Sequence, residues 1–396
     1  MKADFLKYQA QTSPNPLAVE VSHAKGSYIY DISGKAYLDF VAGVSAASLG
    51  HCHPAVVNAI KTQSEKYLHV MVYGEYAQDP AVQLTRLLAE NLPEPLEQTY
   101  LVNSGTEAID GAMKLARRVT GRSAIISANQ AYHGNTFGAL SLMNYEERVA
   151  PFRPVVGDIS HINFNSFEDL NKITENTAGV VLETIQGGAG FIQPEHGWLA
   201  AVRKRCKEVG ALLILDEIQP GFGRTGTFFG FQNYQVVPDI VVMGKGMGGG
   251  MPIGAFTASK AHMQLLSNNP KMGHITTFGG HPVIAAAALA TAKTILESNL
   301  MAQALEKEKL FRGLLKHKLI TEVRGKGLML VAITPSAEIT TEAILMAQEE
   351  SLILFWLLFE TRAIRITPPL TISAKEIKEG CEILLKVLNK IATKMA

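Results

Sequence analysis

The chain has few cysteines and almost no net charge. Its three cysteines, Cys52, Cys206 and Cys381, are scattered along 396 residues. They have neither the parity of a disulfide framework nor the spacing of metal ligands, which predicts reduced, packed thiols. Lys and Arg number 37 against 36 Asp and Glu, a formal net charge of +1. This balance gives no electrostatic reason to expect nucleic acid or an anionic membrane as a partner, and it favours small-molecule ligands.

Several sequence features are also missing. The longest apolar run, residues 352–359, is too short to span a bilayer, and the first residues lack the apolar core of a signal peptide. We therefore expect a cytoplasmic protein. The P-loop pattern G-x-x-x-x-G-K-[ST] does not occur. The His-Cys-His triplet at residues 51–53 has no third ligand at metal spacing and is followed by proline, so it is interpreted as a turn.

The alternation of short and long apolar patterns predicts the architecture. Short β-branched runs recur between residues 100 and 243, and residues 106–119 place their apolar side chains on one helical face. This pattern predicts an α/β fold with a mostly parallel sheet covered by helices. Turn signals are frequent before residue 49, and helical patterns dominate after about residue 285. We expect a large α/β domain over residues 49–289 and a small α+β domain formed by residues 1–48 and 290–396.

Polar residues follow four of the predicted strands at the points where those strands end. In an open α/β sheet, ligands bind beyond the carboxyl ends of the strands. The four strand ends therefore predict a common site. The residues concerned are the segment 103–107, Glu183, Asp216 and Lys245.

Lys245 lies in a glycine-rich tract just after an apolar strand. A lysine with small neighbours at the mouth of a sheet is suited to forming a Schiff base with an aldehyde cofactor. Taken alone, such a residue is more often a solvated loop lysine. Residues 221–226 and 244–249 match the dinucleotide pattern G-x-G-x-x-G by letter, but neither leads into a clear helix.

Asp216 follows five apolar residues, where an unpaired carboxylate is costly. A protonated pyridine nitrogen would serve as its cationic partner, and the ionised acid would keep that ring electron-withdrawing. A metal-binding acid at the end of a strand is an equally good alternative for this residue alone.

Two further segments fit a phosphorylated aromatic cofactor. Ser104, Gly105 and Thr106 open a helix, where free N–H groups and the positive end of the dipole predict a phosphate site. An ordinary N-cap explains the same residues equally well. Tyr132, which precedes His133, could stack on a planar ring, although packing is the more frequent role of a lone aromatic residue.

Motifs along nearly the whole chain resemble the class III pyridoxal-phosphate aminotransferases of fold type I. This group holds acetylornithine, ornithine and 4-aminobutyrate aminotransferases. Asp216 and Lys245 are 29 residues apart (245 − 216), a spacing that resembles that of the class. The matching segments are residues 26–31, 37–39, 49–54, 103–108, 132–134, 215–226, 244–246, 276–280 and 365–370.

The resemblance implies pyridoxal 5'-phosphate as cofactor and a role for each matched residue. Lys245 would carry the cofactor and act as the base of a 1,3-proton shift, and Asp216 would pair with the pyridine nitrogen. Gln219 would hydrogen-bond near the ring oxygen, and Tyr132 would stack on the ring. The remaining residues implied to bind the cofactor are Ser104, Gly105, Thr106, His133, Glu183 and Thr277.

The resemblance also implies a homodimer with shared active sites, because Thr277 would reach the phosphate of a second copy. Arg365 would bind a substrate carboxylate through two parallel hydrogen bonds. At two substrate-binding positions the chain departs from the family. Asn135 stands where many members have arginine, and Gly188 where many have a glutamate that pairs with the carboxylate-binding arginine.

These features predict an aminotransferase with a ping-pong mechanism. The amino group would pass from an amino-acid donor, with an ornithine-like or acetylornithine-like ω-amino donor favoured, to a 2-oxo acid such as 2-oxoglutarate. An aminomutase, epimerase or decarboxylase with the same cofactor is one alternative. A non-catalytic ligand-binding module is another, although binding alone would not require both Lys245 and Asp216.

Overall fold

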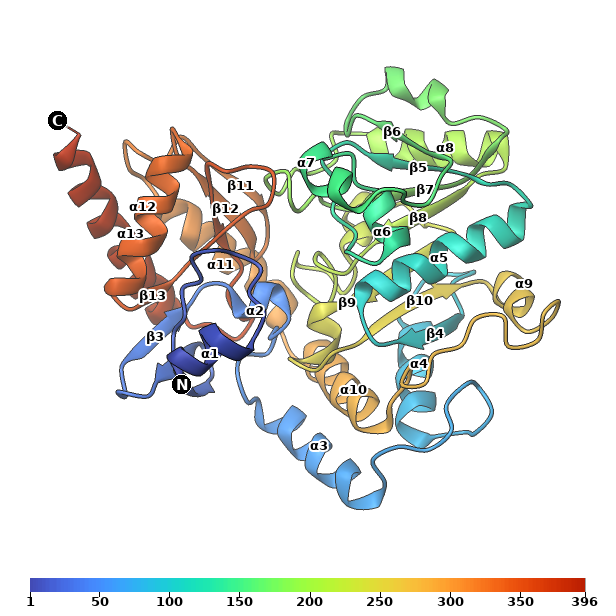
Figure 1. Ribbon diagram of the computed structural model, residues 1–396, viewed down its shortest axis with the longest axis horizontal. Coiled ribbons are helices and arrows are strands. Elements are labelled where there is room, and N and C mark those ends of the chain that lie inside the picture. The colour runs from blue at the N-terminus through green and yellow to red at the C-terminus, as the bar shows by residue number, and fades with distance from the viewer. Residues whose placement is uncertain (396) are drawn as a thin grey trace.

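The large sheet has seven strands in the order β4-β10-β9-β8-β7-β5-β6 in the computed structural model, which describes residues 1–395 (Figure 1). Strands β5 to β9 pair in parallel, whereas β10 is antiparallel to both β9 and β4. Strands β7 to β10 are buried along their whole length, which explains their nearly continuous apolar runs. The mostly parallel sheet expected from the sequence is confirmed. The strands are β4 (Gln98–Val102), β5 (Ala124–Ala128), β6 (Ile159–Ile162), β7 (Thr177–Glu183), β8 (Leu212–Asp216), β9 (Ile240–Gly244) and β10 (Gly254–Ala258).

Helices cover both faces of this sheet, because successive strand residues point to opposite sides. Leu213 and Leu215 of β8 share a core cluster with Trp198 of helix α8 (Trp198–Val209). Leu212 and Ile214 belong to a second cluster, which contains the buried side of helix α5 (Gly105–Thr120). The carboxyl ends of β7, β8 and β9 consequently meet at one edge between the two helical layers.

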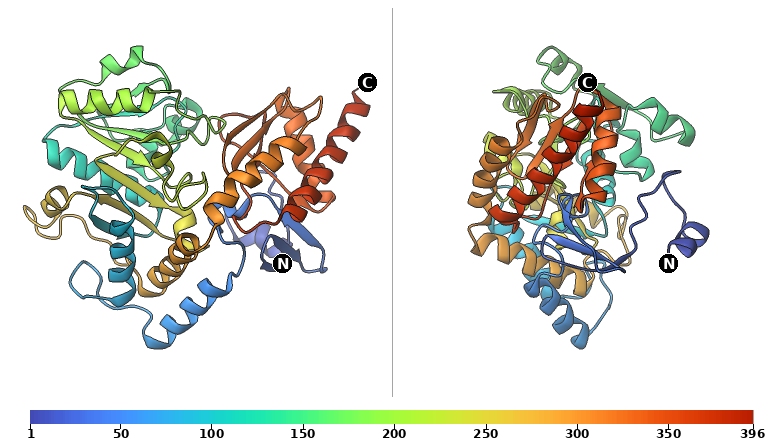
Figure 2. Two further views of the ribbon diagram at one scale, coloured as in Figure 1. Left: turned by 180° about the vertical axis from the view of Figure 1, so that it is seen from behind. Right: turned by 90° about the vertical axis from the view of Figure 1, so that its left-hand side faces the viewer.

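Two four-stranded sheets lie near the two ends of the chain, which are on the same side of the molecule in Figures 1 and 2, and the first of these sheets combines strands from both ends. The first has the order β1-β2-β3-β13, and the second has the order β11-β12-β15-β14. In the first sheet β13 pairs in parallel with β3, which places Leu352 opposite Leu38. The strands are β1 (Val21–Lys25), β2 (Tyr28–Asp31), β3 (Ala36–Asp39), β11 (Glu322–Lys326), β12 (Met329–Ile333), β13 (Leu352–Ile353), β14 (Phe355–Trp356) and β15 (Ala363–Ile366).

The remaining helices pack around these sheets. Helix α10 runs through the domain boundary expected between residues 289 and 290, and the division into two domains stays a prediction. The other α-helices are α1 (Lys2–Tyr8), α2 (Ala42–Ser45), α3 (Pro54–Lys66), α4 (Asp79–Glu90), α6 (Phe137–Ser141), α7 (Glu146–Val149), α9 (Lys260–Met263), α10 (Pro282–Glu297), α11 (Leu300–Leu314), α12 (Ala337–Glu349) and α13 (Ala374–Lys394). Short 3₁₀ turns are η1 (Ala150–Phe152), η2 (Glu168–Lys172), η3 (Gly230–Tyr234), η4 (Lys245–Gly248) and η5 (Gln264–Leu266).

The cysteines agree only partly with the expectation of packed thiols. All three are free, and Cys206 and Cys381 are buried. Cys52 is exposed, so the expectation of a packed thiol is wrong at this position. The reason is local: Cys52 lies in a turn just before helix α3, where its φ is 51°.

Within residues 1–395 no single helix combines the length and apolar character needed to cross a membrane. One pair, α10 and α11, meets the length and composition requirement only when joined across a bend of 72°.

Candidate active site

The carboxyl ends of β7, β8 and β9 open onto a cavity of about 680 Å³. It collects most of the residues singled out from the sequence, although they come from segments far apart in the chain. Those that line it are Gly105, Thr106, Tyr132, His133, Asn135, Glu183, Gly188, Asp216, Gln219, Lys245 and Arg365. Ser104 and Thr277 do not line it.

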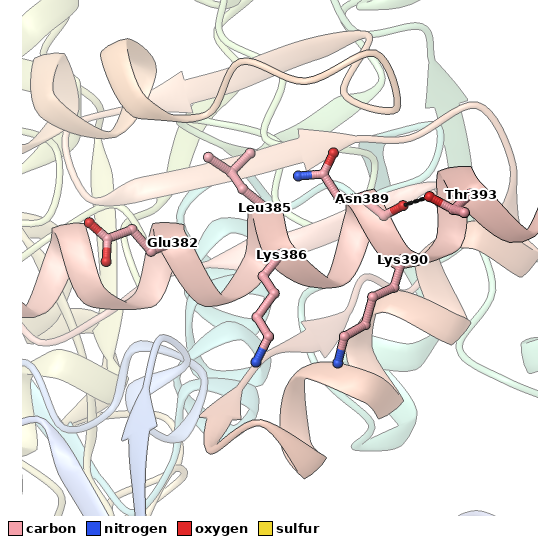
Figure 3. A pocket seen from close by; sticks show the side chains of 6 residues that line it. All are labelled: Glu382, Leu385, Lys386, Asn389, Lys390 and Thr393. Atoms are coloured by element: carbon pink, nitrogen blue, oxygen red, sulfur yellow. Dashed lines mark hydrogen bonds between the residues drawn. The ribbon is translucent and has the colours of Figure 1, made fainter.

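A second hollow, of about 540 Å³, lies along one side of helix α13 and contains none of these residues (Figure 3). Its two lysines, Lys386 and Lys390, lie side by side and both donate to Glu350, at 2.7 and 2.5 Å. The charges of both lysines are therefore paired, and a single helix supplies all of the residues that line this hollow.

Lys245 follows β9 directly and is only partly exposed, on the cavity wall. Its φ of 41° is left-handed, a conformation that costs a side-chain-bearing residue about 1–3 kcal/mol. The next residue, Gly246, is closely packed, because a Cβ there would lie 2.4 Å from Oγ of Ser48 and would force that side chain to shift. Burial lowers the pKa of Lys245, and the nearby charge of Asp216 opposes that shift. Lys245 is therefore not a solvated loop lysine.

Asp216 is buried at the end of β8 and already has a partner within the protein. Its Oδ2 lies 2.8 Å from Nδ1 of His133, and its Oδ1 accepts a hydrogen bond from the N–H of Ile218 at 2.9 Å. Burial lowers the pKa of His133, but the hydrogen bond and charge of Asp216 outweigh this effect and raise it overall. His133, expected from the family resemblance to bind the cofactor, thus supports Asp216, a contact that the sequence did not indicate. Among residues 1–395, no three acidic, histidine or cysteine side chains cluster as metal ligands would.

Glu183 braces two loops at the edge of the cavity. Its Oε1 accepts a hydrogen bond from the N–H of Gly187 at 2.9 Å, and its Oε2 accepts one from the N–H of Tyr132 at 3.3 Å. Burial raises the pKa of Glu183 to about 7. This carboxyl therefore fixes the position of Tyr132, on one side, and of the loop that contains Gly188, on the other.

The start of helix α5 forms another part of the wall. Ser104 is the N-cap, and its Oγ accepts a hydrogen bond from the N–H of Glu107 at 3.4 Å. The N-cap interpretation thus holds for Ser104, whose hydroxyl is engaged away from the cavity. Gly105 and Thr106 face the cavity. Since the first N–H groups of a helix have no acceptor within it, this end remains suited to an anion.

Arg365 is the buried cation of the cavity. It lies in β15 between Ile364 and Ile366 and is 6% exposed. Its Nε donates to the carbonyl of Trp356 at 3.4 Å, and its Nη1 has no hydrogen-bond partner within residues 1–395. Burial lowers the pKa of Arg365 to about 10. Arg365 is therefore a buried residue of the cavity wall, and the alternative of a surface salt bridge does not apply to it.

The place next to Gly188 is filled by an aromatic ring. A Cβ on Gly188 would lie 2.7 Å from Cδ2 of Phe359. The two segments are also joined through the backbone, because the carbonyl of Gly188 accepts from the N–H groups of Phe359 and Glu360, at 3.0 and 3.3 Å. A side chain at position 188 would therefore displace the ring of Phe359.

Several residues that line the cavity were not predicted from the sequence. The apolar run 352–359 was considered only as a membrane segment, although it ends six residues before Arg365 (365 − 359), which is a signal that it lines the same site. Nothing in the local sequence marks Val44 or Arg148. The missed residues are Val44, Arg148, Ile218, Pro220, Phe355, Trp356, Leu357 and Leu358.

Comparison with known proteins agrees with this geometry. The model of the family "Aminotransferase class-III" matches residues 8–388. Acetylornithine aminotransferase of Caldanaerobacter subterraneus subsp. tengcongensis is 37% identical over 389 residues, covering 95% of this chain and 96% of that protein. The [LysW]-aminoadipate semialdehyde/glutamate semialdehyde transaminase of Sulfolobus acidocaldarius is 34% identical over 380 residues, covering 93% and 95%.

A solved structure of similar shape is that of ornithine aminotransferase from Toxoplasma gondii, described with partial occupancy of PLP at its active site. It superposes with a TM-score of 0.92 at 28% identity and covers 99% of this chain and 94% of that one. The predicted fold type, reaction class and cofactor are confirmed. The chain belongs to the class III aminotransferase family and is a pyridoxal-phosphate-dependent transaminase.

Proposed function

We propose that the donor is an amino acid that presents a carboxylate to Arg365, with an ω-amino acid of the ornithine or acetylornithine kind favoured, and that the acceptor is a 2-oxo acid such as 2-oxoglutarate. The observation that carries this proposal is the buried guanidinium of Arg365, whose Nη1 is unpaired within residues 1–395 and which shares a cavity with Lys245. Leaving a buried charge without a partner is costly, so a carboxylate ligand is the natural complement. The names of the relatives, which act on acetylornithine, ornithine and related semialdehydes, support the donor class.

The cavity residues fit pyridoxal 5'-phosphate. Asp216 offers a buried carboxylate for a pyridine nitrogen, Lys245 offers an amine for the aldehyde, and Gly105 and Thr106 offer the start of a helix for the phosphate. Tyr132 and Gln219 would hold the ring. When bound, the cofactor supplies an electron sink for the bond that breaks at the donor carbon.

The protein residues then have separate tasks. Burial favours the neutral amine of Lys245, which is the form able to accept a proton from the donor carbon and return it. His133 and the N–H of Ile218 keep the carboxylate of Asp216 in one orientation. Arg365 orients the substrate through its carboxylate, and the wall formed by Trp356 and its neighbours limits access of water.

We also propose a cytoplasmic homodimer in which Thr277 completes the phosphate site of the second copy. Thr277 does not reach the cavity of its own chain, and its hydroxyl lies 3.5 Å from that of Tyr73. Exposed apolar side chains on the same loop, Ile275 and Phe278, support a protein partner for this surface. We expect neither nucleic acid nor membrane as a partner.

A donor screen tests the proposed function. The holoenzyme is expected to be yellow and to consume 2-oxoglutarate in equal amounts with a carboxylate-bearing amino donor, with parallel lines in double-reciprocal plots. Lys245→Ala should abolish turnover and serves as the control. Conversion of the donor without loss of 2-oxo acid would instead identify a mutase, epimerase or decarboxylase, and binding without conversion would identify a ligand-binding module. A preference for amines without a carboxylate would overturn the assignment of Arg365.

A further inference from the structure

We propose that Arg148 binds the second carboxylate of a dicarboxylic 2-oxo acid in the cavity where Arg365 binds the first. This inference rests on the proposed function, because it concerns the acceptor of the same reaction. It assigns the choice between dicarboxylic and monocarboxylic acceptors to a residue in helix α7, outside every motif recognised in the sequence.

Arg148 faces the same cavity as Lys245 and Arg365, although α7 lies far from both in the chain. Its guanidinium carbon lies 5.9 Å from the ring centroid of Phe359, close enough for a cation–π contact. Its charge also acts on Tyr132, whose pKa is raised by burial and lowered in part by Arg148. The contact with Phe359 places the head of this exposed side chain at the cavity wall, which Tyr132 also lines.

The charge of Arg148 is not neutralised by any carboxylate of residues 1–395. Its neighbour Glu146 pairs with Arg153 instead. The two acids that line the cavity are also engaged, since Asp216 pairs with His133 and Glu183 accepts two backbone hydrogen bonds. Arg148 and Arg365 are therefore two uncompensated guanidiniums in one cavity.

The number of cations decides which acceptor fits. A monocarboxylic 2-oxo acid can neutralise one guanidinium, whereas a dicarboxylic acid can neutralise both. Asn135 cannot bind the second carboxylate as an ion pair, because it carries no charge and its Nδ2 donates to Oη of Tyr132 at 3.2 Å. Arg148 is thus the remaining side chain on this wall that can receive a second carboxylate as an ion pair.

The test compares Arg148→Gln, Arg148→Lys and the control Arg118→Gln as holoenzymes. Arg118 is an exposed arginine of α5 that lies outside the cavity and donates to the carbonyl of Asn268, so its replacement removes the same charge elsewhere. The readouts are kcat/KM for 2-oxoglutarate and pyruvate, and Kd by calorimetry for the non-reacting acids glutarate and butyrate.

Arg148→Gln should weaken glutarate binding and lower kcat/KM for 2-oxoglutarate by about 10- to 100-fold, the effect of losing a charge-assisted hydrogen bond. Pyruvate and butyrate should change less than about 2-fold, since they lack the second carboxylate that such a bond would serve. Arg148→Lys should retain part of the preference for dicarboxylic over monocarboxylic acids, and Arg118→Gln should show the same preference as the parent. Because Arg148 is exposed, added salt should reduce the difference between glutarate and butyrate.

Equal losses for the dicarboxylic and monocarboxylic acids, or no loss for glutarate, would overturn the proposal for Arg148. A parent enzyme that prefers pyruvate would overturn it as well. These results are distinct from failure of the proposed function. If the parent transfers no amino group to any 2-oxo acid, yet glutarate binding still depends on Arg148, the reaction assignment fails and the binding site stands.

Discussion

The ring of Phe359 occupies the space that a side chain on Gly188 would need, since a Cβ at position 188 would lie 2.7 Å from Cδ2 of that ring. Glycine at position 188 therefore leaves no empty space that a glutamate side chain could simply fill. The two positions form one packing unit, in which a side chain at position 188 needs the ring of Phe359 to shift or to be made smaller.

Gly188→Glu alone should lower the free energy of unfolding by about 1–3 kcal/mol, because the new side chain overpacks against Phe359. Gly188→Glu combined with Phe359→Ala should fit, and the carboxylate can then compete for Arg365. Relative to Phe359→Ala, the double variant should lose about 10- to 100-fold in kcat/KM for carboxylate-bearing donors, and far less for uncharged amines. Steady-state kinetics and urea unfolding check both parts. If Gly188→Glu alone is as stable as the parent, the ring of Phe359 moves aside and the predicted overpacking is wrong.

Asp216→Asn should slow removal of the proton from the donor carbon by about 100- to 1,000-fold, the loss expected when a preorganised charge is removed from an active site. The substitution preserves size, so binding of the cofactor can be checked separately by its absorbance. His133→Gln is the companion variant. It removes the 2.8 Å contact to Asp216 and should produce a smaller loss together with a shifted pH profile. Stopped-flow measurements showing an unchanged proton-transfer step in Asp216→Asn would rule out this role.

The pH dependence of stability should report Glu183. Burial raises the pKa of Glu183 to about 7, above the value of 4.5 for an unperturbed carboxyl. Between these values the folded state binds more protons than the unfolded state, so the free energy of unfolding falls as pH rises. The glutamine of Glu183→Gln does not titrate. The free energy of unfolding of this variant, relative to that of the parent, should therefore rise by up to about 3 kcal/mol between pH 4.5 and 8. Urea unfolding at several pH values measures the difference. If the free energies of unfolding of the parent and of Glu183→Gln change equally with pH across this range, the predicted contribution of Glu183 is wrong.

The shared site can be tested by mixing two inactive chains. Lys245→Ala lacks the cofactor-carrying amine, and Thr277→Val lacks the hydroxyl proposed to reach the second copy. Heterodimers should contain one site free of both changes and one site with both, so activity should exceed that of either parent alone. Heterodimers that form, as shown by tags on each chain, but have no added activity would count against a site completed by Thr277.

Those parts of the molecule that depend on local pattern were predictable from the sequence. The alternation of short and long apolar patterns predicted the mostly parallel sheet. The residues at the strand ends predicted that Asp216 and Lys245 line the cavity, because a parallel sheet brings the carboxyl ends of its strands together. Arg148 and Phe359 were not predictable in this way. Their positions depend on packing between segments separated by more than 200 residues, and a helix of four residues leaves no periodic signal.

The same limit applies to His133, which lies near Asp216 only through tertiary packing. Two of the roles expected from the family resemblance concern atoms that the fold uses otherwise, since the Ser104 hydroxyl caps α5 and the Glu183 carboxyl holds two backbone amides. A motif match specifies which residue is present and leaves open which of its atoms are already engaged.

The parallel pairing of Leu352 with Leu38 sets an order of events during synthesis. The two residues are 314 positions apart (352 − 38), so a ribosome adding residues at its usual rate needs about 15 to 60 s to supply the second after the first. During that interval the N-terminal strands present an open edge, which is where unfinished sheets associate wrongly. The seven-stranded sheet, with all its strands between residues 98 and 258, can close earlier. Nascent chains arrested before residue 352 should therefore be cut by protease within residues 21–39, and early protection of that segment would contradict this order.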